Sequence, residues 1–537
     1  MTTVDPITLE VVRNALIGIA DEAGAALRRT SYSPNIKERA DCSTAVFDAQ
    51  GRMVAQAEHI PVHLGSMPMS VDAARAAFDD LAPGDQVLVS DPYAGGTHLP
   101  DWTLVAPIHD DDGRLLGYAA NRAHHSDVGG AAPGSMPAGA TEIYQEGLRI
   151  PPVRLVAAGQ ESHDLVALLL LNTRTPRERL GDLRAQRGAN HLTATRLRTL
   201  AGELGADQLD AAMTATLDHA ERSVRAAVRQ LPDGTYHFAD ALDDDGTGVG
   251  PIPIVAAVTI DDGHVTMDLR GSAGQVPGSV NAPLAVTVSA AVYALRAVAA
   301  PYVPANDGVR RCLTVHTEEG SIVHPRPPAS VAAGNVETSQ RIVDVLLGAF
   351  AVAVPDRVGA ASQGTMNNTL LGGVDPRSGE AFTYYETLAG GTGAGPWGPG
   401  ADGTHSHMTN TRNTPVEAFE IAYPVRVVEY RLRDGSGGVG RHRGGEGIRR
   451  VLEVLADDVT ASVLAERRRS SPWGASGGGD GGRGRNAVVR SDGREEELAP
   501  KATVRLSRGD RLIVETPGGG GYGAAADTDG DDGDPPA

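Results

Sequence analysis

The stretch 104-LVAPIHDDDGRLLGYAANRAH-124 indicates how the fold begins. Two apolar runs flank a polar turn in which Asp112-Gly113 is a β-hairpin signal. Upstream, 43-STAVFDAQGRMVAQ-56 shows the same pattern, and 83-PGDQVLVSDPYAGGTHLPDWTLV-105 is typical of a strand, a loop interrupted by glycines and a second strand. The N-terminal part is therefore expected to be rich in β-sheet.

Helical and β-rich segments alternate along the rest of the chain. Asp5 and Pro6 form a helix start, after which apolar residues recur at helical spacing. We expect helices at 5–28, 163–231, 284–300 and 338–353, and β-rich segments at 233–285 and 355–523. Because β-rich parts flank a helical middle segment, the pattern predicts an α+β fold of mixed, multi-layer architecture rather than a doubly wound sheet.

The chain divides by composition into four parts. Residues 1–160 should form a β-rich region that begins with a helix, and this region should carry the catalytic and metal-binding residues. A helical segment at 161–232 and a mixed α/β, glycine-rich region at 233–523 should follow. The tail 524-AAADTDGDDGDPPA-537 has five aspartates and no basic residue, so we expect it to be disordered.

Charge and hydropathy exclude several classes of protein. With 48 basic and 68 acidic residues the net charge is −20, and without a basic patch nucleic-acid binding is not expected. The longest apolar run, 165-LVALLLL-171, is too short for a transmembrane helix, and the N-terminus lacks the form of a signal peptide. Cys42 and Cys312 are the only cysteines, which excludes a disulfide framework. We therefore expect a cytoplasmic protein without a membrane partner.

The glycine-rich runs do not have the form of nucleotide-binding loops. The runs 476-SGGGDGGRGR-485 and 516-TPGGGGYG-523 lack the Lys-Ser/Thr pair and the helix start that a phosphate loop needs. We expect these runs to be turns or closely packed backbone, and we expect no nucleotide site on this chain.

Two loops each contain a histidine followed three residues later by an aspartate. These are His98 and Asp101 in THLPD, and His124 and Asp127 in HHSD. Imidazole and carboxylate suit Mn, Fe or Zn, whereas the absence of thiolate argues against a structural zinc site. The alternative is that the histidines only make polar contacts in a turn. Two such pairs joined by one predicted hairpin favour the metal site.

Strand geometry separates the two adjacent histidines. If residues 118–125 are extended, His124 and His125 point to opposite faces. We therefore expect His124 to be a ligand, and His125 to be an acid–base residue or to lie behind the ligands. His59 and His63 could line the same pocket, or they could be two surface histidines.

Two further segments carry polar residues. Glu38 and Asp41 lie beside Cys42 in KERADC, where a lone cysteine is more often a small buried residue than a nucleophile. The segment 404-THSHMTNTRNTPVE-417 could bind a polar substrate, or its His, Asn and Thr residues could form turns.

Ordered motifs from about residue 5 to residue 523 resemble those of one family. The motifs are 36-IKERADCSTAVFD-48, 59-HIPVHLGSM-67, 91-DPYAGGTHLPD-101, 121-NRAHHSDVGG-130, 141-TEIYQEGLRIPPV-153, 183-LRAQRGAN-190, 334-GNVETSQRIVD-344, 404-THSHMTNTRNTPVE-417, 444-GGEGIRR-450 and 516-TPGGGGYG-523. By these motifs the chain resembles the hydantoinase B / 5-oxoprolinase B family, which also includes the corresponding subunits of acetone and acetophenone carboxylases.

The resemblance implies a hetero-oligomeric, ATP-dependent enzyme. An A-type partner subunit would bind ATP and phosphorylate a carbonyl oxygen of a small-molecule substrate, and this chain would act on the activated intermediate. The expected activity is ring opening of a hydantoin, N-methylhydantoin or 5-oxoproline. One alternative is a subunit of an acetone- or acetophenone-type carboxylase, and another is a non-catalytic scaffold for the A-type subunit.

The resemblance also implies a ligand set for a divalent metal. Its members would be His98, Asp101 and His124, with Glu38 as a fourth ligand and Asp127 outside the ligand sphere. The catalytic candidates are His125, His63 and His59, of which His125 or His63 would be the base that delivers water.

Overall fold

The computed structural model describes residues 4–57, 60–63 and 65–525. His59 lies outside the described residues. The same holds for the predicted tail from residue 526 onward.

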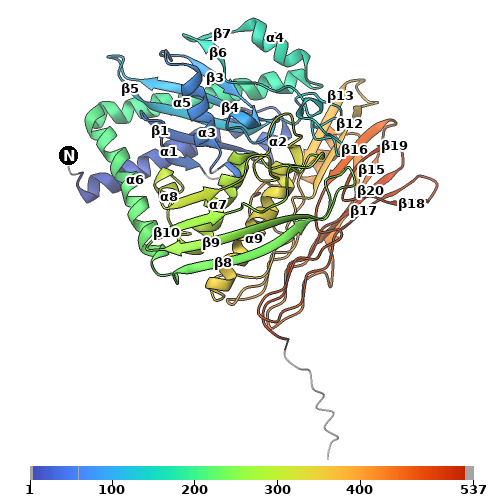
Figure 1. Ribbon diagram of the computed structural model, residues 1–537. Coiled ribbons are helices and arrows are strands. Elements are labelled where there is room, and N and C mark those ends of the chain that lie inside the picture. Colours follow the sequence, from blue (N-terminus) through green and yellow to red (C-terminus); the bar gives the residue numbers. More distant parts are fainter. Residues whose placement is uncertain (1–3, 58–59, 64, 526–537) are drawn as a thin grey trace, which may run out of the picture.

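The first layer is a seven-stranded antiparallel sheet that contains both predicted hairpins (Figure 1). Its strands lie in the order β2-β1-β5-β4-β3-β6-β7. Their bounds are β1 Cys42–Asp48, β2 Met53–Ala57, β3 Gln86–Val89, β4 Asp101–His109, β5 Leu115–His124, β6 Val153–Ala157 and β7 Gln160–Glu161. The hairpins expected at 43–56 and 104–124 are confirmed.

Helices α1 (Pro6–Thr30) and α5 (Pro176–Leu204) pack together on one face of this sheet. The Asp5 carboxylate caps α1, because it accepts hydrogen bonds from the backbone amides of Ile7 and Thr8. Helix α6 (Ala206–Val228) packs beside α1, and α3 (Met67–Ala77) contacts β3, β4 and β5. The helices expected at 5–28 and within 163–231 are thus confirmed.

Two adjacent residues of β5 show that α3 and α5 cover opposite faces of the sheet. Arg122 donates to Ser70 Oγ of α3 at 2.7 Å, whereas Asn121 donates to the backbone oxygen of Gln186 on α5 at 2.8 Å. This alternation decides which side chains of the strand reach the candidate site.

The second layer is a four-stranded sheet that packs on two helices. Its order is β11-β10-β9-β8, with β10 and β11 parallel. The bounds are β8 Gly234–Leu242, β9 Ile252–Asp261, β10 His264–Asp268, β11 Leu313–His316, α7 Leu284–Ala299, a π-helix at Gly334–Thr338 and α9 Ser339–Ala353. The helices expected at 284–300 and 338–353 are confirmed, and apolar side chains of α7, α9 and β8–β10 share one core.

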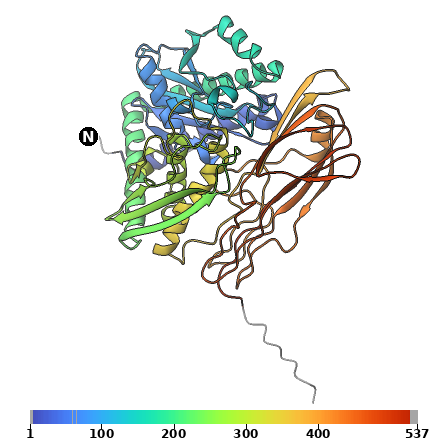
Figure 2. The same cartoon turned by 45° about the vertical axis from the view of Figure 1, so that its right-hand side comes forward.

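Two antiparallel sheets form the C-terminal part and lie together on one side of the molecule (Figures 1 and 2). The first, in the order β13-β12-β16-β19, contains β12 Asn368–Val374, β13 Ala381–Glu386, β16 Val459–Leu464 and β19 Lys501–Leu506. The second, in the order β14-β15-β20-β17-β18, contains β14 Val425–Leu432, β15 Ile448–Val454, β17 Arg485–Val489, β18 Glu495–Glu497 and β20 Arg511–Glu515. Their inner faces share an apolar core.

The glycine-rich runs are closely packed backbone, which is one of the two forms expected from the sequence. A Cβ atom at Gly519 would lie 2.0 Å from the backbone oxygen of Thr392, and one at Gly521 would lie 2.1 Å from that of Val439. No side chain fits at such distances, so these glycines allow separate loops to pack against each other.

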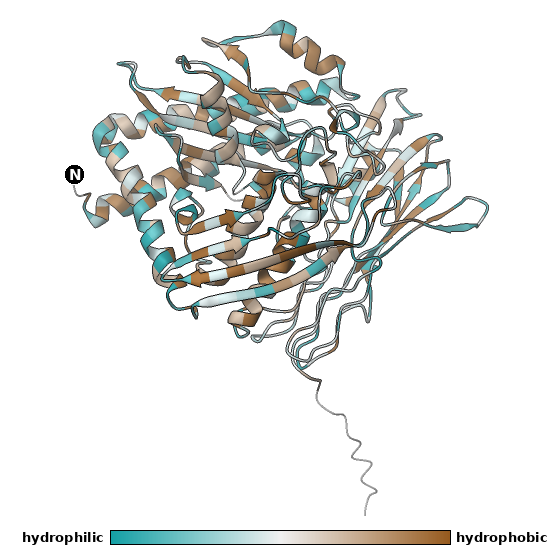
Figure 3. Cartoon of the chain, viewed as in Figure 1, coloured by the Kyte–Doolittle hydropathy of each residue, from teal (hydrophilic) through white to brown (hydrophobic). Residues whose placement is uncertain are grey.

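Short helices complete an α+β fold, as expected. They are α2 Pro34–Lys37, α4 His163–Leu171, α8 Asp307–Arg310 and α10 Val416–Ala422, with 3-10 turns at Pro61–His63, Pro92–Ala94 and Ile143–Gln145. Figure 3 shows apolar α4 at the edge of the molecule, where Leu171 is 85% exposed. Within the described residues, no helix is both long enough and apolar enough to cross a membrane.

Candidate metal centre

The register of the β4–β5 hairpin places an aspartate beside a histidine. Asp101, the first residue of β4, pairs directly with His124, the last residue of β5. Directly opposed residues have neighbouring side chains. His98 lies in the turn before β4, where its backbone oxygen accepts a hydrogen bond from the Asp101 amide at 3.1 Å. Residues that are 26 positions apart in the sequence therefore meet at one end of the sheet.

His98, Asp101 and His124 form a compact triangle of ligand atoms. His98 Nε2 lies 3.1 Å from His124 Nδ1, and Asp101 Oδ1 lies 3.2 Å from each of these nitrogens. A neutral imidazole carries one N–H, so protons alone cannot bridge all three edges well. Ligands that bind one ion at about 2.1 Å and at right angles lie roughly 3 Å apart. The triangle therefore fits a shared divalent cation.

Burial and mutual contact favour the protonation states of Asp101 and His124 that metal ligation needs. All three side chains are at most 3% exposed. Burial opposes ionisation of Asp101, but His98, His124 and His63 outweigh it and hold the pKa of the carboxyl well below its usual value. Burial lowers the pKa of His124, which favours the neutral imidazole.

His63 lies beside the triangle, as one of the sequence alternatives predicted. Its Nδ1 lies 2.8 Å from Ser43 Oγ, and its Nε2 lies 3.7 Å from Asp101 Oδ2. Burial lowers the pKa of His63, so the neutral ring can accept a proton. His63, Asp101 and His124 line one small cavity, whereas His59 lies outside the described residues.

The structure places His125 away from this cavity. Its Nε2 lies 2.9 Å from Gln186 Oε1 of α5, and its ring packs on Trp102 at a centroid distance of 4.2 Å. Burial, followed by the charge of Arg179, lowers the pKa of His125 to about 3. His124 and His125 therefore point to opposite faces, as strand alternation predicted, and His125 does not reach the triangle.

The two other predicted carboxylates have different surroundings. Asp127 forms an ion pair with Arg174 at 2.9 Å and accepts hydrogen bonds from loop amides, while the Glu38 side chain is exposed. The carboxylate of the same motif that lines the cavity is that of buried Asp41, whose backbone oxygen accepts a hydrogen bond from the His124 amide. Glu38 directly follows the short helix α2 and is exposed, whereas Asp41 is buried.

Distant segments supply the remaining walls, which the sequence did not identify. The Tyr385 ring stacks on His124 at 4.5 Å, and its hydroxyl donates to Asn368 Oδ1 at 2.9 Å. Asn368 Nδ2 in turn donates to Glu337 Oε1 at 2.8 Å, and burial raises the pKa of Glu337 to about 8. Glu337 occurs in the quoted motif GNVET, but its position at this wall depends on the π-helix, which no sequence period reveals.

The cavity at the triangle has a volume of about 20 Å³, which is room for roughly one water molecule. The residues that line it are Asp41, Ile60, Val62, His63, Asp101, His124, Asn335, Val336, Met366, Tyr385, Thr387, Met408, Thr409 and Thr411.

A second buried polar cluster, which we call the ion network, lies between the second layer and the C-terminal sheets. Its members are Asp240, Arg341, Asp344, Glu466, Arg467 and Lys501. Arg467 contacts Asp240 at 2.6 Å and Asp344 at 2.8 Å, and Lys501 forms an ion pair with Glu466. These six side chains comprise three basic and three acidic groups, and the Asp244 carboxylate lies 3.6 Å from Lys501 Nζ at the edge of the network.

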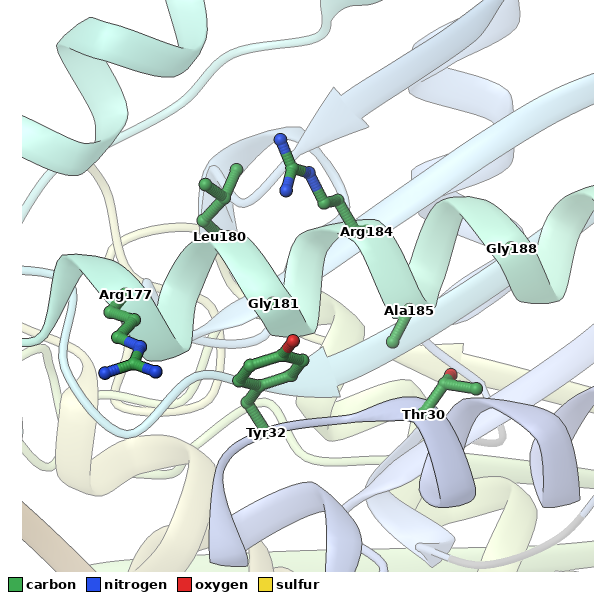
Figure 4. A pocket seen from close by; sticks show the side chains of 8 residues that line it. All are labelled: Thr30, Tyr32, Arg177, Leu180, Gly181, Arg184, Ala185 and Gly188. Atoms are coloured by element: carbon green, nitrogen blue, oxygen red, sulfur yellow. The ribbon is translucent and has the colours of Figure 1, made fainter.

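A wider hollow of about 420 Å³ lies between the end of α1 and the outer face of α5 (Figure 4). In Figure 4 the side chains of Arg177 and Arg184 point in different directions, and Tyr32 lies next to Gly181. Because the two guanidinium groups do not converge, the hollow offers no focused site for an anion. The triangle remains the better candidate.

Residues 5–525 match the protein family described as hydantoinase B/oxoprolinase. An uncharacterized protein of Methanocaldococcus jannaschii is 42% identical over 98% of this chain and 92% of its own length. The 5-oxoprolinase of Dictyostelium discoideum is 37% identical over 97% of this chain, which spans 40% of that protein. Caprolactamase subunit beta of Pseudomonas jessenii is 34% identical over 97% of this chain and 91% of its length.

Two solved structures share the fold over 97% of this chain. The ATP-dependent caprolactamase of Pseudomonas jessenii superposes with a TM-score of 0.91 at 33% identity, over 92% of its matched chain. An acetone carboxylase superposes with a TM-score of 0.90 at 19% identity, over 76% of its chain. At that identity the second likeness concerns the fold alone.

Proposed function

The chain belongs to the hydantoinase B/oxoprolinase family, and on this premise we propose that it is the B-type subunit of an ATP-dependent enzyme that opens a cyclic amide. A partner subunit phosphorylates the amide oxygen, and this chain hydrolyses the activated ring. The observation that carries the proposal is the buried triangle of His98, Asp101 and His124 beside His63.

His98, Asp101 and His124 would hold a divalent Mn, Fe or Zn ion. The fit rests on three converging ligand atoms, on neutral imidazole beside ionised carboxylate, and on the absence of cysteine from the set. A divalent ion in this position supplies a Lewis acid at the cavity.

Phosphorylation of the amide oxygen makes the amide carbon a better electrophile. A lactam carbonyl is a poor electrophile, whereas its O-phosphorylated imidate accepts water at carbon. Water adds to that carbon as a proton passes to His63 Nε2, and the ring C–N bond then breaks as its nitrogen gains a proton. The acyl phosphate that results is hydrolysed by a second water, which releases phosphate and the ring-opened amino acid. The hydrogen bond between Ser43 and His63 Nδ1 orients the base for these proton transfers.

The proposed partner is an ATP-binding subunit of the hydantoinase A or oxoprolinase A type. Two facts support it: the similar Pseudomonas jessenii protein is named a subunit beta, and this chain spans only 40% of the Dictyostelium discoideum 5-oxoprolinase. The glycine-rich runs of this chain pack as backbone and leave ATP binding to the partner.

The test is reconstitution of the chain with an A-type partner, followed by assays of ATP consumption. We expect hydrolysis of ATP to depend on a cyclic amide such as 5-oxoproline, hydantoin or caprolactam, with release of the ring-opened product. ATP consumption only with acetone plus bicarbonate would instead identify a carboxylase. Full activity of the His124→Ala variant would identify a scaffold.

A further inference from the structure

We infer that a second cavity in this chain, behind the segment that walls the triangle, binds a compact cyclic amide as a holding site. The inference rests on the proposed function for the class of substrate. We call this second cavity the tryptophan cavity. It has a volume of about 230 Å³, and the residues that line it include Trp397, Trp473, Asp344, His407, Arg357 and residues 359–362.

The tryptophan cavity is large enough for a substrate ring, and the cavity at the triangle is not. The cavity at the triangle has about 20 Å³, whereas a ring of about six to eight non-hydrogen atoms needs on the order of 150 Å³, since one water alone takes about 30 Å³ of liquid. The tryptophan cavity accommodates such a ring and the triangle cavity does not. A substrate ring must therefore be bound somewhere before the centre opens to admit it.

The two cavities share one thin wall. His407 lines the tryptophan cavity, while the next two residues, Met408 and Thr409, line the triangle cavity. Gln340 anchors this wall by donating to the backbone oxygen of Ser406 at 3.1 Å. A molecule in the tryptophan cavity therefore lies one segment away from the candidate metal centre. The wall belongs to the His-, Asn- and Thr-rich stretch at 404–417 whose role the sequence left open.

The polar end of the tryptophan cavity has an acceptor and a donor without good partners. Asp344 Oδ1 and His407 Nε2 form a long ion pair of 3.4 Å with each other, and neither has a hydrogen-bond partner within the described part of the chain. The side chain of Asp344 is only 1% exposed. Its other oxygen contacts Arg467 at 2.8 Å, so Oδ1 alone remains for a ligand. Unsatisfied buried polar atoms are costly unless a ligand pairs with them.

This pair matches the edge of a ring amide. A small ring forces its amide to be cis, so N–H and C=O point to the same side, whereas an open-chain secondary amide is trans. The N–H would donate to Asp344 Oδ1, and the carbonyl would accept from the N–H of His407. The side walls suit a flat apolar ring, because Trp397 and Trp473 present aromatic surfaces and Ala360 and Gly393 present small ones.

The experiment uses intrinsic fluorescence, because two of the three tryptophans line this cavity and the third, Trp102, is buried against His125. The full chain is titrated with 2-pyrrolidone and with caprolactam, and with open-chain N-methylpropanamide as the matched linear amide. We expect saturable fluorescence changes with both rings, and binding of the linear amide at least tenfold weaker.

Two variants locate the binding. Leu347→Phe fills the cavity from α9, and His407→Asn removes the donor with a residue that tolerates the positive φ of 57° at this position. Each should raise the Kd for the rings at least tenfold. The matched control is Val352→Phe, because Val352 lies on the same helix but is 61% exposed and should leave the Kd unchanged. Thermal melts check that all three variants fold.

The outcomes separate this inference from the proposed function. The His124→Ala variant should bind the rings as tightly as the wild type, because the triangle lies behind the wall. Ring binding that is lost in Leu347→Phe supports the holding site even if no ATP-dependent activity is found. An unchanged Kd in both cavity variants, or equal binding of the linear amide, would overturn the holding site even if the enzyme is active.

Discussion

Two buried polar clusters in this chain differ in how their groups are compensated. In the ion network each charged group meets a group of opposite sign, as Arg467 does with Asp240 and Asp344. In the triangle the Asp101 carboxylate lies between two histidines, with His63 beside them, and the outer nitrogens His98 Nδ1 and His124 Nε2 have no hydrogen-bond partner among the described residues. The carboxylates of the ion network form ion pairs with arginine or lysine, although Asp344 Oδ1 makes no hydrogen bond, whereas the Asp101 carboxylate forms ion pairs only with imidazoles among the described residues.

This contrast separates buried polar groups that stabilise the fold from buried polar groups that bind a ligand. A balanced, hydrogen-bonded network can hold layers of the fold together, and removal of one member leaves a buried charge without compensation. An incomplete cluster in a cavity contributes little stability and is instead a candidate for binding a ligand or metal. Substitutions that alter one cluster at a time, with activity and stability measured separately, can therefore test this distinction.

The largest expected effect is on activity. Asp101→Asn or His124→Ala should lower cyclic-amide-dependent turnover of the reconstituted enzyme by on the order of 1000-fold, about 4 kcal/mol of barrier, because the metal ligands are lost. Elemental analysis should show the loss of the bound metal in parallel. The control is His109→Gln at the other end of β4, which should retain both metal and turnover. Wild-type turnover in Asp101→Asn would contradict the role of the triangle.

A substitution in the ion network should mainly lower the stability of the protein. Lys501→Met removes the cation that pairs with Glu466 in a fully buried site, so we expect the free energy of unfolding to fall by about 3–5 kcal/mol. Urea denaturation measures this change. Lys37→Met is a matched control, because Lys37 is the only other lysine and is exposed. Equal stability of the two variants would show that the network is not structural.

Glu337 lies between the two clusters and should make stability depend on pH. Its folded pKa is raised from 4.5 to about 8 by burial, so the folded state holds a proton that the unfolded state releases. This group's contribution is complete below pH 4.5 and is lost as pH rises toward 8, at about 1.4 kcal/mol per pH unit. Glu337→Gln mimics the protonated acid and should remove that slope between pH 5 and pH 8. The free energy of unfolding is measured by urea denaturation at several pH values in this range. The same pH dependence in wild type and variant would contradict the assignment.

The smallest effect on activity is expected at His125. Because it contacts Gln186 and Trp102 on the face opposite to the triangle, His125→Asn should change turnover by less than about tenfold. Stability should fall by about 1–2 kcal/mol, because a buried hydrogen bond and a ring contact are lost. Steady-state kinetics and urea denaturation on one preparation provide both values. A loss as large as that of His124→Ala would place His125 in the catalytic site after all.

Local patterns in the sequence predicted much of the fold and part of the site. Apolar spacing, the Asp5 cap and the Asp112-Gly113 turn predicted α1 and the β4–β5 hairpin, because these depend on neighbouring residues. Strand alternation also separated His124 from His125. Glu38 was expected near the metal, but it follows α2 and is exposed, and Asp41 lines the cavity in its place.

The family, the strands and the histidine and aspartate types of the candidate centre follow from the sequence, because periodicity and motif order are local properties. Which of these residues meet depends on tertiary packing. Tyr385 reaches His124 across 261 positions (385 − 124), and Lys501 meets the backbone of Asp244 across 257 positions. Such contacts depend on how whole sheets pack, and no short window of sequence contains that information. The compensation of each buried charge, which separates the ion network from the triangle, is decided at that same level.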